Sequence, residues 1–195
     1  FDICVASILL VLLTPVFLVL IPAIRYSTNA PAIFGHKRIG RHGEEFSCLK
    51  FRTMVANADE VLRQLLNDNP AARKEWEKDL KLKNDPRITR IGNILRKTSL
   101  DELPQLWNVL KGEMSLVGPR PIVREELSRY EEKVDYYLKV RPGMTGLLQV
   151  SGRNNVTYKS RVNFDTGYVK NWSLWYDIVV MLKKVRFVFG DKRAY

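Results

Sequence analysis

Two adjacent carboxylates, Asp101 and Glu102, stand where the chain turns into a helix, within the segment 98–106. The basic pair Arg96 and Lys97 precedes them directly. A carboxylate pair of this kind, with a divalent cation held by oxygen ligands, suits chemistry on phosphate groups. The remainder of the chain supplies abundant positive charge for phosphates and an N-terminal apolar run for a lipid.

A purely structural role competes with this interpretation. Ser99 and Glu102 match an S-x-x-E capping box, which places Asp101 in a first helical turn where the helix dipole favours negative charge. Pro104 favours a different start, because proline suits the first helical position and disfavours helical geometry in the residue before it. The alternative prediction is therefore a helix from Pro104, with both carboxylates on the preceding loop.

Other catalytic signatures are absent from the sequence. The chain has no phosphate-binding G-x-x-x-x-G-K-S/T, no dinucleotide-binding G-x-G-x-x-G and no H-E-x-x-H. Its two histidines, His36 and His42, lie among Gly and Arg residues that favour loops. Cys4 and Cys48 are too few for a disulfide framework or a zinc knuckle. Catalysis would therefore fall to carboxylate, Lys and Arg side chains.

The charge balance points to an anionic partner. Lys and Arg outnumber Asp and Glu by 32 to 21, which gives the 195 residues a net charge of +11. Nucleic acid, an anionic membrane surface and phosphorylated substrates all fit that balance. The scarcity of cysteine indicates a reducing, cytoplasmic-facing environment. Because the chain begins with Phe1 rather than Met, we expect a piece of a longer protein.

A membrane segment is predicted from Ile3 to Ile24, where no charged residue occurs. Its length suffices to cross a hydrocarbon core of about 30 Å as a helix. Thr14-Pro15 falls near the midpoint, so a kink is expected there. The physics of exposed backbone in lipid favours a kinked spanning helix over a sharp return to the same face.

Periodicity predicts the elements that position the carboxylates. A strand is expected over 45–54 with Phe46 and Cys48 on one face, and helices over 57–67, 71–83 and 88–97. In the last of these, Ile91, Ile94 and Leu95 should point inward.

Two later segments have open interpretations. Arg120 stands between two prolines, which suits either forked phosphate recognition or an ordinary turn. The aromatic and basic helix around 172–186 suits either a bilayer interface or a core helix with a basic outer face.

In six stretches the chain resembles the bacterial sugar transferases, the monotopic polyprenyl-phosphate phosphoglycosyl transferases. The stretches occur in family order over nearly the whole chain: Thr14-Pro15, the KFRTM of 50–54, the DPRIT of 85–89, the LRKTSLDELPQL of 95–106, the MSLVGPRP of 114–121 and the PGMTG of 142–146. The usual break is Ser-Pro, but Thr14 keeps the hydroxyl that can bond a freed carbonyl. The segment from Ser151-Gly152-Arg153 to Ala194-Tyr195 resembles larger members that prime O-antigen or capsule synthesis.

The resemblance implies a mixed α/β fold that is mostly helical. Residues 1–28 would form a re-entrant membrane helix-break-helix with its break at Thr14-Pro15, contrary to the spanning preference above. Residues 29–195 would form a compact catalytic domain on the cytoplasmic face of the bacterial inner membrane. Amphipathic helices of this domain would lie in the membrane interface, in contact with inner-membrane lipid.

The resemblance also implies an activity. Family members transfer a phosphosugar from a UDP-sugar to undecaprenyl phosphate, giving a sugar-diphospho-lipid and UMP by a ping-pong mechanism. Asp101 would be the nucleophile that forms an aspartyl-phosphosugar intermediate. Asp101 and Glu102 would hold Mg²⁺. Four basic residues would bind phosphate or substrate: Lys50, Arg52, Arg96 and Arg120.

The transferred sugar is expected to be galactose, with glucose or an N-acetylhexosamine as the alternative. The product would begin O-antigen, capsule or exopolysaccharide synthesis. Nucleic acid is not expected as a partner, and a homo-oligomer is left open. Two competing hypotheses remain: a single-step transferase in which the lipid phosphate attacks directly and Asp101 only binds metal, and a non-catalytic basic module at the membrane surface.

Overall fold

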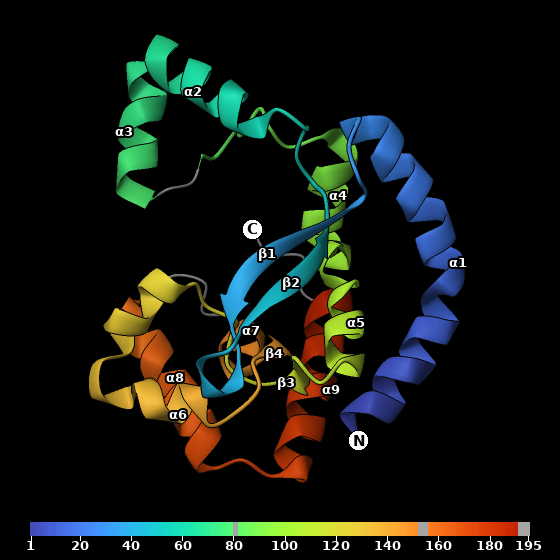
Figure 1. The fold of residues 1–195 in the computed structure, drawn as a ribbon, viewed down its shortest axis with the longest axis vertical. Coiled ribbons are helices and arrows are strands. Elements are labelled where there is room, and N and C mark those ends of the chain that lie inside the picture. The colour runs from blue at the N-terminus through green and yellow to red at the C-terminus, as the bar shows by residue number, and fades with distance from the viewer. Residues whose placement is uncertain (80–81, 152–155, 191–195) are drawn as a thin grey trace. The chain divides into compact units, whose positions relative to one another are not determined.

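The computed structural model describes residues 1–79, 82–151 and 156–190 (Figure 1). The described chain is mostly helical with four short strands, which confirms the expected α/β class. Gly152, Arg153 and Ala194-Tyr195 of the motifs above lie outside the described residues. In chain order the elements are α1 (Asp2–Thr28), β1 (Ile33–Ile39), η1 (Arg41–Gly43), β2 (Glu45–Phe51), α2 (Ala58–Asp68), α3 (Pro70–Asp79), α4 (Arg90–Thr98), η2 (Leu100–Glu102), α5 (Gln105–Leu110), β3 (Ser115–Val117), η3 (Arg124–Lys133), α6 (Val134–Leu138), β4 (Gly143–Thr145), α7 (Leu147–Val150), α8 (Tyr158–Lys170) and α9 (Leu174–Gly190).

The chain divides into two compact units. Unit 1 comprises residues 1–14, 35–50 and 102–195, and unit 2 comprises 15–34 and 51–101. One boundary crosses α1 between Thr14 and Pro15, and another crosses η2 between Asp101 and Glu102.

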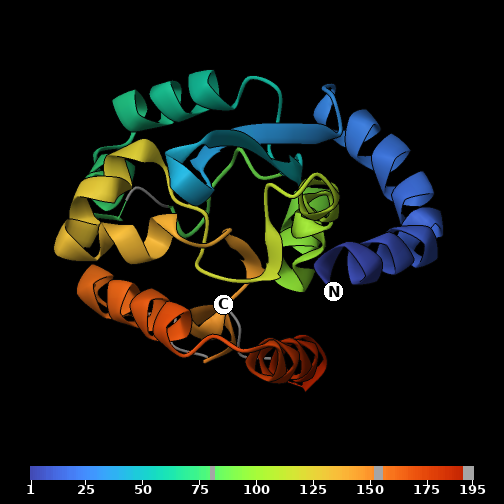
Figure 2. The same ribbon diagram turned by 60° about the horizontal axis from the view of Figure 1, so that its bottom comes forward.

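Unit 1 is built around two small sheets. Strand β1 pairs with β2 across the turn η1, and β3 pairs with β4 in parallel, in the register Ser115↔Gly143 and Val117↔Thr145. An antiparallel bridge joins Ile39 of β1 to Ile122. Strand β2 alternates as predicted, because Phe46 and Cys48 are buried while Glu45 and Ser47 are exposed. Helices α7 and α9 lie near the second sheet (Figures 1 and 2).

A buried asparagine joins α5 to β2. The side chain of Asn108, 1% exposed, accepts a hydrogen bond from the backbone N–H of Leu49 at 3.0 Å. Its Nδ2 donates to the carbonyl of Ser47 at 2.8 Å and to Glu113 Oε2 at 2.6 Å. The amide thus pairs with one donor and one acceptor of β2, as a neighbouring strand would.

The core of unit 1 includes the first half of α1. Ala6 is fully buried against the cluster that contains Phe46, Cys48, Leu106 and Val180, and Val5, Leu9, Leu10 and Leu13 pack around it. The Ser115 hydroxyl of β3 donates to Asp2 Oδ2 at 2.7 Å, which ties the beginning of α1 to the second sheet. One face of this half helix therefore belongs to the protein interior.

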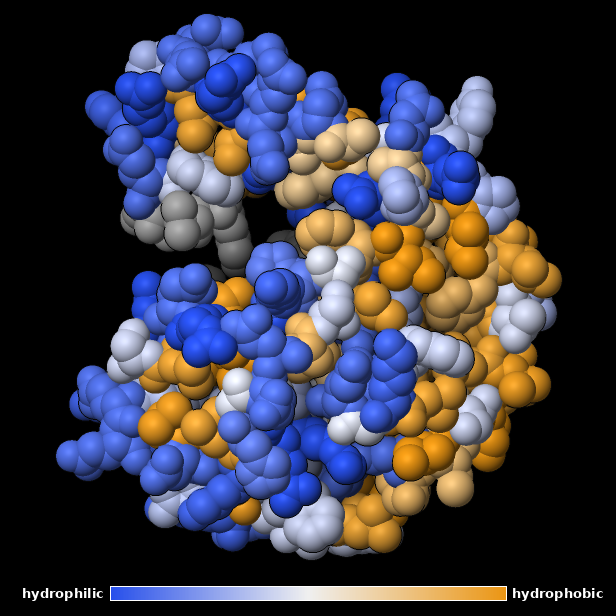
Figure 3. Space-filling view, viewed as in Figure 1, coloured by the Kyte–Doolittle hydropathy of each residue, from blue (hydrophilic) through white to orange (hydrophobic). Residues whose placement is uncertain are grey.

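The opposite face of α1 is apolar and exposed. The helix has a mean hydropathy of 2.9, and 6% of its most apolar window is buried. Among the described residues it is the one helix long and apolar enough to cross a membrane, by length and composition. Figure 3 shows hydrophobic side chains gathered over it. Such a surface needs lipid or another apolar partner.

Helix α1 continues through the proline at its middle. Pro15 has no N–H, so the carbonyl of Val11 lacks its usual helical donor. The Thr14 hydroxyl donates instead to the carbonyl of Leu10, at 2.9 Å. The hydroxyl predicted to bond the freed carbonyl therefore bonds the one before it, a contact typical of threonine within helices.

In unit 2, backbone hydrogen bonds join the KFRTM motif of 50–54 to the DPRIT motif of 85–89. An antiparallel bridge joins Met54 to Ile88, and the Thr89 N–H donates to the Thr53 carbonyl at 3.0 Å. Thr89 also caps α4, accepting from the Gly92 N–H at 2.9 Å. A Cβ on Gly92 would lie 2.0 Å from the Thr53 oxygen, so only glycine permits this approach.

Several expected helices are confirmed, with changes at their ends. Helix α2 follows Asn57 as predicted, and α3 is described as far as Asp79, while 80–81 lie outside the described residues. The inward orientation of Ile94 was wrong, because its side chain is 61% exposed while Leu95 is buried. In helix α9, Val180 is in the core and Trp175 is 72% exposed. Its position in a bilayer interface stays a prediction.

Replacing Asn108 with alanine should lower the free energy of unfolding by about 2–4 kcal/mol, because two backbone groups of β2 lose their partners inside the core. Chemical denaturation of the detergent-purified chain measures this. Asn93→Ala, on an exposed position of α4, is the matched control and should stay within about 0.5 kcal/mol of the parent. Equal stability of the Asn108→Ala variant and the parent would contradict the role of this amide.

Candidate active site

The two carboxylates lie on a short turn between two helices. Helix α4 ends at Thr98, and its C-cap Ser99 has a φ of 57°, in the left-handed region. The turn η2 then carries Asp101 and Glu102, and α5 begins at Gln105 with Pro104 as its N-cap. The capping-box interpretation of Ser99 is therefore wrong, because Ser99 closes the preceding helix. The alternative, with both carboxylates ahead of a helix at Pro104, is confirmed.

In unit 1, Glu102 forms an ion pair with a predicted phosphate-binding residue. Lys50 Nζ donates to Glu102 Oε1 at 2.8 Å, and each side chain is about one-third exposed, at 36% and 31%. Partly exposed pairs contribute little stability, roughly 0–1 kcal/mol. The consequence is geometric, because the pair holds an ammonium group beside the carboxylate on η2.

Further cations surround this pair on the β2 side. Burial raises the pKa of the Cys48 thiol, while the nearby charges of Lys50, Arg38 and Arg120 act to lower it. These three cations and Glu102 therefore all lie within electrostatic reach of one buried sulfur atom. Lys50, Glu102 and Arg120 were named as site residues from the sequence, whereas Arg38 was not singled out. Its alternation with Ile39 in a strand was the signal available.

The loop of Arg120 is fixed by its glycine neighbours. The Gly118 N–H donates to the Thr145 carbonyl at 2.9 Å, and the Gly143 N–H donates to the Pro119 carbonyl at 2.8 Å. A Cβ on Gly118 would lie 2.7 Å from the Arg141 carbonyl oxygen. The GPRP and PGMTG motifs thus meet in the parallel β3–β4 pair, and this contact leaves the Arg120 side chain exposed.

In unit 2, Arg96 and Arg52 are held in different ways. Arg96 Nε donates to Thr53 Oγ1 at 2.9 Å, so the KFRTM segment orients the arginine that precedes the carboxylates. Arg52 Nε donates to the carbonyl of Pro31 at 2.9 Å, and its guanidinium lies over the Phe34 ring. The assignment of both to phosphate binding stays a prediction.

A second charged pair supports Arg96. Asp85 and Arg87 are nearly buried and form a forked ion pair at 2.7–2.8 Å. Burial raises the pKa of Asp85, but the hydrogen bonds and charge of Arg87, with the charge of Arg96, leave it below its ordinary value. The DPRIT motif therefore places a fixed negative charge within electrostatic reach of Arg96.

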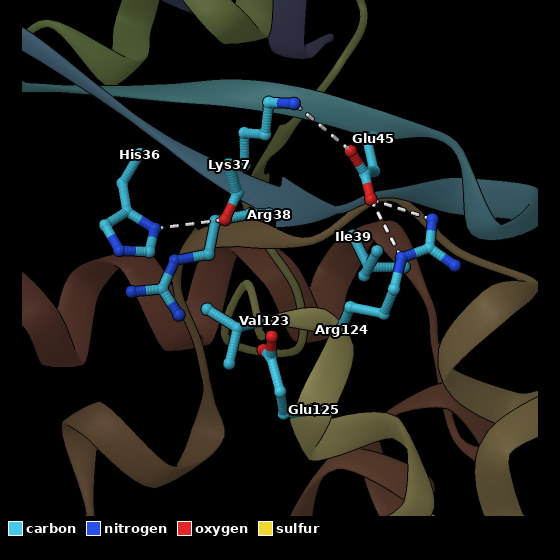
Figure 4. Close-up of a pocket in the computed structure, with 8 residues that line it drawn as sticks. All are labelled: His36, Lys37, Arg38, Ile39, Glu45, Val123, Arg124 and Glu125. Carbon is cyan, nitrogen blue, oxygen red and sulfur yellow. Dashed lines mark hydrogen bonds and ion pairs between the residues drawn. The ribbon is translucent and has the colours of Figure 1, made fainter.

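A cavity of about 270 Å³ opens beside Arg38 (Figure 4). Its walls come from β1, the beginning of β2 and the chain before and within η3. The Glu45 carboxylate already has two basic partners in this cavity. It accepts a hydrogen bond from Arg124 Nε at 2.9 Å and lies 3.9 Å from Lys37 Nζ. The lining residues are His36, Lys37, Arg38, Ile39, Glu45, Val123, Arg124 and Glu125.

The carboxylates of η2 suit one particular mode of Mg²⁺ binding. Among the described residues, no group of three or more His, Cys, Asp or Glu side chains forms a cage. Asp101 and Glu102 offer two carboxylates of the hard oxygen class. Mg²⁺ is commonly held by one or two carboxylates together with water and substrate phosphates. The residues therefore fit a cation shared with a phosphorylated substrate.

A buried acid lies near the same cations. Asp165 of α8 is 7% exposed and accepts a hydrogen bond from the Tyr130 hydroxyl at 2.6 Å. Burial raises its pKa to about 6, against the opposing effects of Tyr130, Arg161 and Arg120. Arg120 thus acts electrostatically on both Cys48 and Asp165.

Comparison with known proteins identifies relatives over the whole chain. Residues 1–191 match the model of the family described as bacterial sugar transferase. The chain is 63% identical to an uncharacterized sugar transferase of Haemophilus influenzae, 58% to undecaprenyl-phosphate galactose phosphotransferase of Salmonella typhimurium and 57% to UDP-galactose-lipid carrier transferase of Erwinia amylovora. Each comparison covers 100% of this chain and 41% of the relative. The chain thus spans less than half the length of these relatives.

The pKa of Asp165 predicts a pH-dependent stability. A buried carboxyl whose pKa is raised stabilises the fold at low pH and loses that contribution as the pH rises through about 6. Asp165→Asn should therefore gain about 2–2.5 kcal/mol relative to the parent between pH 4 and pH 7.5. Denaturation at both pH values measures this, with the exposed Asp59→Asn as control. A difference independent of pH would contradict the assignment.

Proposed function

The chain belongs to the bacterial sugar transferase family, and on this premise we propose that it transfers a sugar phosphate from a UDP-sugar to undecaprenyl phosphate. The family match over residues 1–191 carries the proposal. Two relatives at 57–58% identity have galactose in their names. One name adds a lipid carrier, and the other adds undecaprenyl phosphate. The Lys50–Glu102 pair, with Arg120 and Arg38 nearby, supports it with the positive charge that a diphosphate requires.

The proposed reaction has two steps. A carboxylate oxygen of Asp101 attacks the β-phosphorus of the UDP-sugar, the bond to the bridging oxygen breaks and UMP leaves. A phosphate oxygen of undecaprenyl phosphate then attacks the same phosphorus, and the bond to Asp101 breaks to restore the carboxylate. Covalent catalysis of this kind divides one difficult displacement into two. Ping-pong kinetics would follow.

The basic side chains have supporting roles in this proposal. Lys50 and Arg120 would bind phosphate oxygens, and Arg96 and Arg52 would add positive charge. Arg120 suits forked recognition, because its loop is rigid and its guanidinium is exposed. Lys50 would also set the orientation of Glu102 through their 2.8 Å contact.

Mg²⁺ would be held by Asp101 and Glu102 together with the substrate. When bound, the cation would neutralise charge on the diphosphate and on the departing UMP. The protein's own contribution is to keep the Glu102 carboxylate in place, which the Lys50 contact does.

Galactose is the proposed sugar, and glucose or an N-acetylhexosamine is the alternative. The names of the Salmonella and Erwinia relatives favour galactose. The lipid-linked product would begin a surface polysaccharide such as O-antigen, capsule or exopolysaccharide. UMP release from a panel of UDP-sugars would identify the preferred donor.

For the membrane segment, we propose a re-entrant helix that enters and leaves by the cytoplasmic face. The Thr14-Pro15 motif near the middle of α1 and the family match support this topology. The beginning of α1 is bound to the second sheet of unit 1, because Asp2 accepts a hydrogen bond from Ser115. A helix that crossed the bilayer would place its ends on opposite faces, about 30 Å apart.

Replacing Asp101 with asparagine should reduce UMP release from UDP-galactose by at least about a thousandfold, because the attacking oxygen is lost. The exposed Asp68→Asn is the control and should retain parental activity. Mass spectrometry of the parent incubated with UDP-galactose alone should detect a phosphohexose on Asp101. UMP release that needs the lipid acceptor, with no adduct, would favour direct attack by the lipid. Parental turnover in Asp101→Asn would refute the proposed mechanism.

The proposed topology predicts that both ends of α1 face the cytoplasm. In a Cys4→Ser, Cys48→Ser background, single cysteines replace Phe1 or Tyr26, which are 53% and 90% exposed. An impermeant maleimide should label both in inverted inner-membrane vesicles and neither in intact spheroplasts. Labelling of the two positions from opposite faces would establish a spanning helix instead.

A further inference from the structure

Two arginines share one carboxylate: Arg38, so far described only as nearby positive charge, and Arg161, to which the proposed function gives no role. Arg38 Nη1 lies 3.8 Å from Glu126 Oε2, and Arg161 Nη1 lies 3.8 Å from Glu126 Oε1. Both separations exceed hydrogen-bond length, so neither guanidinium is engaged in a close fork with Glu126. The three side chains are 23–26% exposed. They come from β1, η3 and α8 of the same unit.

Glu126 itself is held by the backbone around it. The Val123 N–H donates to Glu126 Oε2 at 3.1 Å, closing the first turn of η3. This contact fixes the carboxylate midway between the two arginines. These three side chains carry two positive charges and one negative charge, and Arg161 also lies within electrostatic reach of Asp165.

Arg161 has an unmet donor. Its buried Nε finds no hydrogen-bond acceptor among the described residues. The guanidinium lies over the Tyr158 ring, with its carbon 5.3 Å from the ring centre. A stacked arginine with an unmet N–H group is pre-organised to receive an oxyanion, because the ring fixes the plane of the guanidinium without accepting from that N–H.

The cluster continues into the site described above. Arg38 acts on the Cys48 thiol together with Lys50, Arg120 and Glu102, and Arg161 acts on Asp165 together with Arg120. Arg38 also lines the 270 Å³ cavity, where it stands beside His36 (Figure 4). This cavity gives Arg38 access to a ligand of the size of a phosphate group.

We propose that Arg38 and Arg161 together bind a phosphate group of the transferase substrates, with Glu126 as the positioning residue. The two loosely paired guanidinium groups and the unmet Nε donor of Arg161 match a phosphate monoanion or one end of a diphosphate. The assignment rests on the proposed function for the identity of the substrate. The chemistry of the site, two arginines and a phosphate, does not depend on it.

Direct binding tests the site without turnover. Isothermal titration of the detergent-purified chain with pyrophosphate and with UMP should give affinities about tenfold weaker in R38Q and in R161Q, since each variant loses a charge-assisted contact. The matched control is R129Q, because the exposed Arg129 stacks on the same Tyr158 ring at 5.0 Å. R129Q should stay within twofold of the parent. Parental affinities for both ligands in R38Q and R161Q would overturn the proposal.

Steady-state kinetics identifies which substrate supplies the phosphate. A KM for UDP-galactose raised about tenfold in R38Q and R161Q, with the KM for undecaprenyl phosphate unchanged, assigns the site to the nucleotide. The reverse result assigns it to the lipid phosphate. Either supports the site, and unchanged KM values for both substrates count against it.

The positioning role of Glu126 is tested by comparing affinity with stability, because a purely structural residue would change the stability. E126Q keeps the Val123 contact through its amide oxygen but removes the charge between the arginines, so its unfolding free energy should stay near that of the parent. Its affinity for pyrophosphate should fall severalfold, because the arginines are no longer positioned. E126D should restore part of that affinity. An affinity in E126Q equal to that of the parent, with both arginine variants impaired, would remove Glu126 from the proposal.

The two proposals fail separately. A parent chain that binds pyrophosphate through Arg38 and Arg161 but releases no UMP from any UDP-sugar would refute the proposed function and keep the phosphate site. A parent chain that turns over UDP-galactose, with R38Q and R161Q matching R129Q in affinity and KM, would refute the site and keep the function.

Discussion

The geometry of unit 1 depends on the amide of Asn108. Strand β2 has β1 on one side, and on the other the Asn108 side chain meets the Ser47 carbonyl and the Leu49 N–H. The same residue lies in α5, directly after the turn that carries Glu102. Because one buried amide binds β2 to α5, it also sets the distance between Lys50 at the end of that strand and Glu102. A hydrophobic contact would hold the two elements together without fixing their register.

The second constraint is the close approach of two glycine motifs. Gly118 and Gly143 lie so near the opposing backbone that a Cβ on either would fall within 3 Å of it. This approach makes the parallel β3–β4 pair, which holds Arg120 at the surface of a rigid loop. A guanidinium positioned in this way loses little entropy when an anion binds. Backbone packing therefore positions the Arg120 guanidinium for the phosphate binding that we propose for it.

Much of this arrangement was predictable, and the exceptions have physical causes. The alternation of Phe46 and Cys48 predicted β2, and Pro104 predicted the start of α5. The capping box at Ser99 matched a local pattern equally well, but the left-handed conformation of Ser99 ended α4 there. Ile94 followed helical periodicity and is exposed all the same. A local pattern is compatible with more than one conformation of a segment, and tertiary packing determines which of them forms.

The amino-acid sequence by itself determined the family, the apolar segment and the identity of the acidic pair, because these depend on composition and on short motifs in fixed order. Only the tertiary structure decided which cations share a site, since residues distant along the chain meet through strand pairing and helix packing. Arg38, Glu126 and Arg161 show this best. Each is an ordinary charged residue in the sequence, and their significance comes from two 3.8 Å separations that no local pattern encodes.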